Sequence, residues 1–347
     1  MITSTSNAKV KRLVNMRKKR KLRDEEGLFI VEGIRMFREV PKDRLVEVYV
    51  SEEFWDKERK AVEQILSGTS VKPEILADFV FEYISDTKTP QGILCLVRQK
   101  SYDISEITNR KDADAPLLIV LDQIQDPGNL GTIVRTAEGA GVTGIVLSSD
   151  CVDMYNPKVV RSTMGAAYRV PFCYVEDLAK EVEQMKEAGI CTYAAHLEGK
   201  NSYDEEDYRG ASAFLIGNEG NGLRDEVAKQ AQVYIRIPMK GQVESLNAAI
   251  ATAILTFEAA RQRRSLSYRY SLLSYKKYSK LMLSLKLHYK RRGRLCRQYV
   301  GWPYLYFFWS LRSSRWVLRQ SGLQQERWWR FWLRYWDLDL AYRLLSL

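Results

Sequence analysis

Between residues 115 and 264, short apolar runs alternate with stretches whose apolar residues recur every three or four positions. Leu117–Leu121 is apolar throughout, as expected of a strand that is buried on both faces. Apolar residues in Asn129–Ala140 follow the i, i+3, i+4, i+7 spacing of a helix. Further strands are predicted at Gly144–Leu147, Ile190–Ala194, Ala213–Ile216 and Val233–Ile237, and further helices after Asn156, over Leu178, Val182 and Met185, and over Asn247–Arg263. This alternation predicts a parallel sheet with helices on both faces.

A smaller α/β pattern precedes this one. Strand-like runs lie at Leu28–Val31, Leu45–Val50 and Gly92–Val97, and a helix is predicted at Glu53–Leu66. Asn7 is a candidate cap for a first helix. The polar stretch Ser101–Ala115 is interpreted as a linker, so residues 1–110 and 115–264 are expected to form separate domains.

Residues 265–347 differ abruptly in composition. They hold seven of the eight tryptophans, ten of the 20 tyrosines, and 17 Lys and Arg against 3 Asp and Glu. Three interpretations stay open: a basic aromatic RNA-binding tail, a segment at a membrane surface, or residues translated out of the native frame. The abrupt change favours the last. The longest uncharged apolar run, Gln298–Leu311, is too short to span a bilayer, and no membrane association is expected.

The charge of the chain is concentrated in the same tail. The whole chain carries +11, which suggests a polyanionic partner, but residues 1–264 hold 37 basic and 40 acidic groups. One local exception is the first 23 residues, with nine Lys and Arg and no acidic residue; on composition alone this is a solvated charge run. The sequence has five scattered cysteines and two histidines, so no metal site is predicted. The cysteines are expected to be reduced thiols in a cytoplasmic protein, and the N-terminus shows no secretory signal.

Polar or glycine-rich loops follow three predicted strands, where open parallel sheets bind ligands. After the first strand, Arg135 points away from the apolar helix face, which alone favours a solvated arginine. The loop G-N-E-G-N-G of residues 217–222 matches neither a P-loop nor a dinucleotide-binding loop; alone it predicts a turn with Glu219 on the surface. After the last strand, Ser245 or Asn247 would cap the following helix, and capping alone is as well supported as a functional role.

Taken together, these loops resemble the three motifs of the SpoU/TrmH family of RNA ribose methyltransferases, within the SPOUT superfamily. The matching segments are NLGTIVRTAEGAG, FLIGNEGNGL and IPMKGQVESLNAAIATAILTFEA. The resemblance runs from Leu117 to about Arg263. The first region, with N-A-K-V-K from Asn7 and F-I-V-E-G from Phe29, is similar to the substrate-binding domain of many members, which resembles a small RNA-binding ribosomal protein.

The resemblance implies a parallel α/β sheet tied in a deep trefoil knot, and a homodimer with its active site at the dimer interface. It implies S-adenosylmethionine as cofactor, at Gly217, Ile237, Met239 and Leu246. It implies a catalytic set of Asn129, Arg135, Glu219, Ser245 and Asn247, with no metal. In the family, the arginine is the proposed base for the ribose 2′-hydroxyl. A guanidinium normally has a pKa above about 12, so stabilisation of a developing alkoxide is the alternative role.

The expected function is therefore methylation of a ribose 2′-hydroxyl in structured RNA. Large-subunit ribosomal RNA is favoured over transfer RNA, because the N-terminal domain resembles those of members that act on it. A transfer RNA methyltransferase and a non-catalytic RNA-binding protein of the same fold are the alternatives. Beside such a catalytic domain, the basic N-terminal arm is expected to bind RNA phosphates through Lys18, Arg20 and Arg23.

Overall fold

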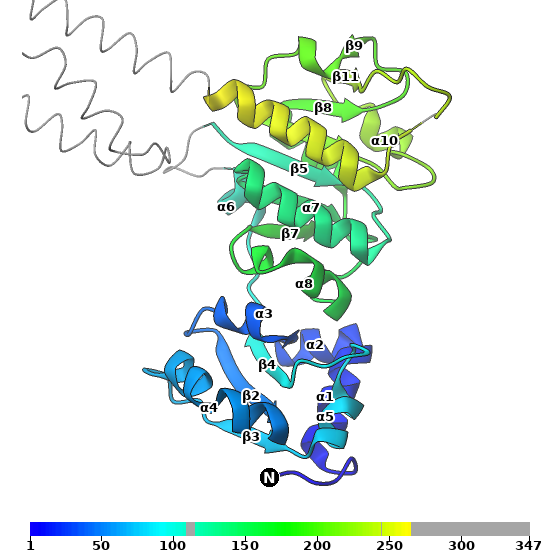
Figure 1. Cartoon of the computed structure of the whole chain (residues 1–347). Coiled ribbons are helices and arrows are strands. Elements are labelled where there is room, and N and C mark those ends of the chain that lie inside the picture. Colours follow the sequence, from blue (N-terminus) through cyan, green and yellow to red (C-terminus); the bar gives the residue numbers. More distant parts are fainter. Residues whose placement is uncertain (109–114, 244, 265–347) are drawn as a thin grey trace, which may run out of the picture. The chain divides into compact units, whose positions relative to one another are not determined.

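The computed structural model describes residues 1–108, 115–243 and 245–264, which contain two β-sheets (Figure 1). The expectations for residues 265–347 fall outside the described residues. None of the described helices combines the length and hydropathy that crossing a bilayer requires.

The N-terminal sheet has four strands in the order β1-β4-β2-β3. Strand β4 is antiparallel to β1 and β2, and β3 is parallel to β2. The strands are β1 (Leu28–Glu32), β2 (Leu45–Ser51), β3 (Pro73–Leu76) and β4 (Ile93–Arg98). The helices are α1 (Ala8–Lys18), α2 (Arg20–Glu26), α3 (Ile34–Arg38), α4 (Glu52–Leu66) and α5 (Asp78–Ile84). The three expected strands and the long helix are confirmed to within one residue at each end, whereas β3, α2, α3 and α5 were not individually predicted.

Alternation along β1 explains why helices cover both faces of this sheet. Leu28 and Ile30 pack in one apolar cluster with residues of α1 and α5, and Phe29 and Val31 pack in another with α3 and α4. Helix α1 begins where expected, because the side chain of Asn7 accepts a hydrogen bond from the backbone N–H of Lys9 at 2.9 Å.

The second sheet has seven strands in the order β7-β6-β5-β10-β8-β11-β9 (Figure 1). All its neighbouring strands pair in parallel, which confirms the predicted sheet type. The strands are β5 (Leu117–Leu121), β6 (Gly144–Ser148), β7 (Phe172–Val175), β8 (Cys191–Ala195), β9 (Asn201–Ser202), β10 (Ser212–Ile216) and β11 (Val233–Arg236). The carboxyl ends of these strands therefore share one edge, where the loops of interest emerge.

Helices cover both faces of the parallel sheet. Helices α7 (Pro127–Ala140) and α8 (Pro157–Thr163) and the helix of residues 248–264 pack in a cluster with Leu117 and Ile119. Helices α6 (Ile104–Thr108), α9 (Leu178–Glu187) and α10 (Asp225–Ala228) pack in a cluster with Leu118 and Val120. Within the expected linker, residues 104–108 form α6, and Ile107 of this helix is fully buried.

A buried ion pair joins the two sheets. Arg23 of α2 is 3% exposed and donates to Asp153 Oδ2 at 2.6 and 3.2 Å. It also donates to the backbone oxygen of Met16 at 2.6 Å. The rings of Phe29 and Tyr155 pack nearby, with their centroids 4.4 Å apart. The expectation that Arg23 binds RNA phosphates is therefore wrong, because its guanidinium is buried and bonded within the protein.

Candidate functional site

Three side chains from three separate loops form a chain of hydrogen bonds at the carboxyl edge of the parallel sheet. The Asn247 Nδ2 atom donates to Asn129 Oδ1 at 2.9 Å. The Asn129 Nδ2 atom in turn donates to Glu219 Oε1 at 2.9 Å. These residues follow β11, β5 and β10, so the structure brings together one expected site residue from each predicted motif.

The carboxylate of Glu219 accepts more than this one bond. The backbone N–H groups of Gln125 and Asp126 donate to its two oxygens at 3.4 and 3.3 Å. Partial burial raises the pKa of Glu219, but the hydrogen bonds from Asn129 and the backbone outweigh it, and the net pKa lies below the ordinary value. Glu219 is therefore ionised at neutral pH, and its charge is directed toward the first loop.

Other residues cap the two nearby helices, so the side-chain amide of Asn129 is free to bond Asn247 and Glu219. Helix α7 begins at Pro127 rather than near Asn129, because Asp126 is its cap and accepts from the backbone N–H of Asn129 at 2.8 Å. The helix of residues 248–264 is capped by Asn247, whose Oδ1 accepts from the N–H groups of Ala249 and Ile250 at 2.9 and 3.3 Å. Asn247 thus both caps its helix and contacts Asn129.

The loop after β10 needs glycine at its first position. A Cβ atom on Gly217 would overlap the backbone of Gly222 and Leu223. Asn218 closes the loop, because its backbone N–H and oxygen bond Gly222 at 2.9 and 3.0 Å. Its side chain donates to the backbone oxygen of Gln123 at 2.7 Å, which ties the loop to the one after β5.

Sequence reasoning missed two residues that hold these loops in place. Asp122, fully buried at the end of β5, accepts from Arg224 Nε at 2.9 Å and from its backbone N–H at 2.9 Å. The next residue, Gln123, has a φ of 55°, a conformation uncommon outside glycine. The sequence signal for the ion pair was a charged residue placed directly after a fully apolar strand, but its partner lies about a hundred residues away.

The remaining expected catalytic residues lie outside this hydrogen-bonded group of side chains. Arg135 is exposed on α7, and six residues of helix place it about 240° around the axis from Asn129. Ser245 is also exposed, two residues before Asn247. Within the described part of one chain, the structure therefore groups Asn129, Glu219 and Asn247 but leaves Arg135 and Ser245 on the surface.

An apolar surface lies beside Arg135. Ile250 and Phe257 are 50% and 49% exposed, one above the other on the helix of residues 248–264. That helix runs next to α7 (Figure 1), and a Cβ atom on Gly139 would lie 3.6 Å from the Phe257 ring. Gly139 is one helical turn beyond Arg135, so the guanidinium and the exposed apolar face are neighbours.

The expected cofactor positions lie in the loops after β10 and β11, in which two other glycines have open space beside them. Cβ atoms on Gly222 and Gly241 would meet no atom within 4 Å. Ile237, Met239 and Leu246 are half-buried in the irregular segment that follows β11. A loop of this kind offers apolar side chains together with backbone donors and acceptors, which suits the adenosine and methionine parts of S-adenosylmethionine.

Two family models match the chain. Residues 116–257 match the SpoU rRNA Methylase family, and residues 7–95 match the MRM3-like substrate binding domain. The two matches coincide with the two sheets.

Curated and solved relatives extend over both regions. The chain is 30% identical to the 23S rRNA (guanosine(2553)-2'-O)-methyltransferase RlmP of Bacillus subtilis, over 74% of this chain and 97% of that protein. The structure is similar to that of an AdoMet-bound rRNA methyltransferase from Sinorhizobium meliloti, with a TM-score of 0.66 and 28% identity over 75% of this chain and 97% of that one. It is also similar to the SpoU methyltransferase AviRb from Streptomyces viridochromogenes in complex with AdoMet, with a TM-score of 0.66 and 25% identity over 75% of this chain and 99% of that one.

Proposed function

Because the chain belongs to the SpoU rRNA methylase family, we propose that it methylates a ribose 2′-hydroxyl of ribosomal RNA with S-adenosyl-L-methionine as donor. The expected enzyme class, an RNA ribose 2′-O-methyltransferase, is confirmed by family membership. The observation that carries the proposal is the chain from Asn247 through Asn129 to Glu219, since it joins the three family motifs at one sheet edge.

Large-subunit ribosomal RNA is the proposed substrate. The Bacillus subtilis relative is named as a 23S rRNA methyltransferase, and it is matched along nearly its whole length. The match of residues 7–95 to a substrate-binding domain supports a separate RNA-holding domain. A non-catalytic role is disfavoured because every expected motif residue is present.

The proposed site divides its tasks among named residues. S-Adenosylmethionine, when bound, supplies a methyl group on a positively charged sulfur. Gly217, Ile237, Met239 and Leu246 would hold it, with Gly217 allowing the loop of residues 217–222 to close on itself. Asn129, Glu219, Ser245 and Asn247 would position the reacting groups. Arg135 would stabilise the alkoxide that develops as the 2′-hydroxyl loses its proton, or accept that proton.

We also propose that two copies assemble about the face formed by α7 and the helix of residues 248–264. Exposed Ile250 and Phe257 favour burial against a partner, and Arg135 beside them would then lie at the interface, near the other copy's site. A deep knot in the parallel-sheet domain remains part of the proposal. It is supported by the match of residues 116–257 to the SpoU rRNA Methylase family, whose members the sequence motifs resemble.

Methyl transfer from labelled S-adenosylmethionine tests the proposal directly. The full chain would be incubated separately with ribosomal and transfer RNA from cells that lack the gene. The expected result is label at one site of large-subunit RNA, in a nucleotide that resists alkaline cleavage on its 3′ side. Label in transfer RNA alone would overturn the substrate, and cofactor binding without transfer to any RNA, including precursor particles, would overturn the activity.

A further inference from the structure

Helix α8 lies directly against the first turns of α7, which carry Asn129 of the candidate site. A Cβ atom on Gly131 would overlap Ser162 and lie 2.9 Å from the backbone oxygen of Val159. Gly131 is two residues beyond Asn129, and Val159 directly follows Lys158. The start of α8 is therefore next to the start of α7, with the glycine allowing close approach of the two helices.

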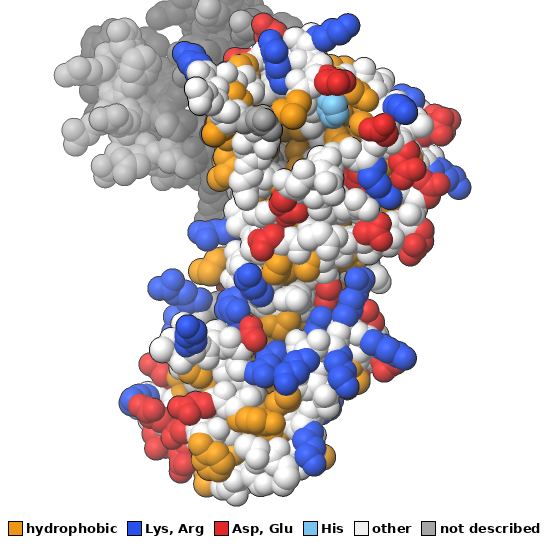
Figure 2. All heavy atoms as spheres, turned by 90° about the vertical axis from the view of Figure 1, so that its right-hand side faces the viewer, with side chains coloured by type: hydrophobic (Ala, Val, Ile, Leu, Met, Phe, Trp, Pro, Cys, Tyr) orange, Lys and Arg blue, Asp and Glu red, His pale blue; other side chains and the backbone are white. Residues whose placement is uncertain are grey.

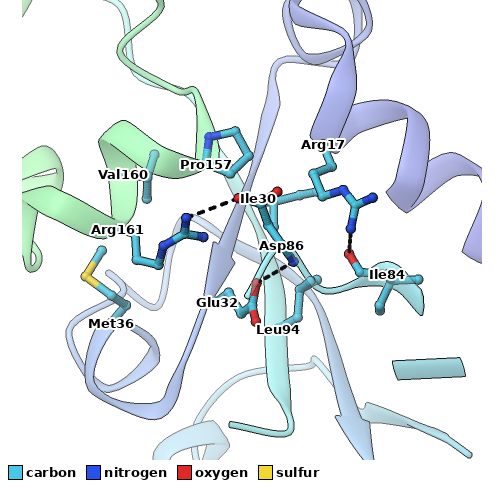
Figure 3. Close-up of a pocket in the computed structure, with 10 residues that line it drawn as sticks. All are labelled: Arg17, Ile30, Glu32, Met36, Ile84, Asp86, Leu94, Pro157, Val160 and Arg161. Atoms are coloured by element: carbon cyan, nitrogen blue, oxygen red, sulfur yellow. Dashed lines mark hydrogen bonds and ion pairs between the residues drawn. The ribbon is translucent and has the colours of Figure 1, made fainter. Parts of the chain in front are cut away.

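The other side of α8 faces the N-terminal domain. Figure 3 shows a small pocket lined by Arg17 of α1 and by Pro157, Val160 and Arg161 of α8. Arg161 pairs there with Asp86 of the N-terminal domain at 3.1 Å.

A second contact lies at the start of α2. The Arg20 guanidinium is 5.3 Å from the ring centre of Tyr174, whose hydroxyl bonds the backbone of Val152 and Met154 just before α8. The end of α1, the start of α2 and α8 therefore form one continuous surface.

Three lysines of this surface have side chains exposed to solvent. Lys18 and Lys19 lie at the junction of α1 and α2, and Lys158 lies in the first turn of α8. Among the described residues, none of the three has an acidic side chain within 4.0 Å. Figure 2 shows basic side chains gathered across the middle of this face, at the level of α2 and α8, while acidic side chains are more frequent above and below.

We propose that α8 is part of the RNA-binding surface and that Lys158 binds a backbone phosphate of the substrate, in continuation of phosphates bound by Lys18 and Lys19. The inference rests on the proposed function and adds the path of the RNA from the N-terminal domain to Asn129. Phosphate contacts of this kind fix register without reading sequence. The buried Arg23–Asp153 pair would hold the two halves of the surface at a fixed separation, so that the bound strand reaches the site in one register.

Replacement of Lys158 by glutamine in the full chain tests the proposal. Each lost phosphate contact lowers RNA affinity about five- to eightfold at 0.1 M monovalent salt and reduces the slope of log K against log salt by about 0.7–0.9. The matched control is Lys180→Gln, since Lys180 is an exposed lysine of α9, on the opposite face of the same sheet. Binding to an unmodified fragment of the ribosomal RNA that the wild type methylates would be measured from 50 to 200 mM KCl.

The proposal predicts a lower affinity and a flatter slope for Lys158→Gln, recovery of both in Lys158→Arg, and no change in Lys180→Gln. Affinity for S-adenosylmethionine should remain that of the wild type in all three variants, which separates a lost RNA contact from a damaged site. If the wild type methylates ribosomal RNA and Lys158→Gln binds it as Lys180→Gln does, the role of α8 is wrong while the proposed function stands. If the wild type methylates no RNA, both are overturned.

Discussion

Two polar clusters of this protein differ in what their hydrogen bonds achieve. At the joint between the sheets, Arg23 and Asp153 are 3% and 8% exposed, and the guanidinium bonds both the carboxylate and backbone oxygens. At the sheet edge, Glu219 and Asn247 are exposed and are linked through the half-buried Asn129. Removing a partner from the joint leaves a buried charge, whereas removing one from the edge leaves a group that water can reach. The joint should therefore govern stability and the edge should govern chemistry.

The largest effect is expected at the joint. Arg23→Ala should lower the free energy of unfolding by about 3–5 kcal/mol, because the carboxylate of Asp153 would stay buried without its cation. Arg20→Ala is the control and should cost less than about 1 kcal/mol, since Arg20 is exposed. Denaturant unfolding at pH 7 measures both. Similar losses of unfolding free energy in the two variants would show that the buried position of Arg23 is not what matters for stability.

On the surface of α7, outside the cluster at the sheet edge, Arg135→Ala should lower the rate of methyl transfer about 100-fold or more. Its affinity for S-adenosylmethionine should stay within a few fold of the wild type, because Arg135 lies on α7, outside the loops after β10 and β11. Single-turnover methylation of ribosomal RNA is the measurement. Normal turnover would remove Arg135 from the mechanism.

Asn247 allows stability and chemistry to be separated at one position. Asn247→Ala removes the helix cap and should cost about 1 kcal/mol, whereas Asn247→Ser keeps a capping oxygen but is too short to reach Asn129. Both variants should lose activity, while only the alanine variant should lose stability. Unfolding and methylation would be measured on the same preparations. Full activity in the serine variant would show that the contact with Asn129 is dispensable.

A smaller effect concerns the titration of Glu219. Its pKa is lowered in the folded protein, so its stabilising contribution is present above the ordinary glutamate pKa of about 4.3 and is lost as the pH falls through the folded value. Asn129→Ala removes one donor and should raise the pKa of Glu219, which moves this acid loss to higher pH. Carbon-13 NMR of the Glu219 carboxyl follows the shift, and an unchanged midpoint would place the stabilising donors elsewhere.

The smallest effect is expected from deletion of residues 265–347. These residues differ in composition from the rest of the chain, and the Bacillus subtilis relative is matched along 97% of its length by 74% of this chain. The shortened chain should methylate ribosomal RNA at the rate of the full chain. A loss of RNA affinity would favour the basic aromatic extension instead.

Local sequence patterns predicted the helices and strands, but they did not predict which residues far apart in the sequence would pair. Leu117–Leu121 was predicted to the residue because an apolar run between polar loops can be placed by its own composition. A lysine- and arginine-rich segment has the same pattern whether each side chain is solvated or buried. The fate of Arg23 depends on Asp153, which lies 130 residues away. The cluster of Asn129, Glu219 and Asn247 was found from the family motifs, whereas the Asp122–Arg224 pair had no such signal.

The order of the hydrogen-bonded residues along the sequence has a consequence for synthesis of the protein on the ribosome. Asn129 and Glu219 are synthesised before Asn247, whose side chain is the donor to the Oδ1 atom of Asn129 among the described residues. Until Asn247 has been synthesised, the hydrogen-bonded group at the sheet edge therefore lacks one of its three side chains. Activity should begin only after the start of the helix at residues 248–264 has left the exit tunnel, so the growing polypeptide is kept from modifying RNA until its final motif has emerged.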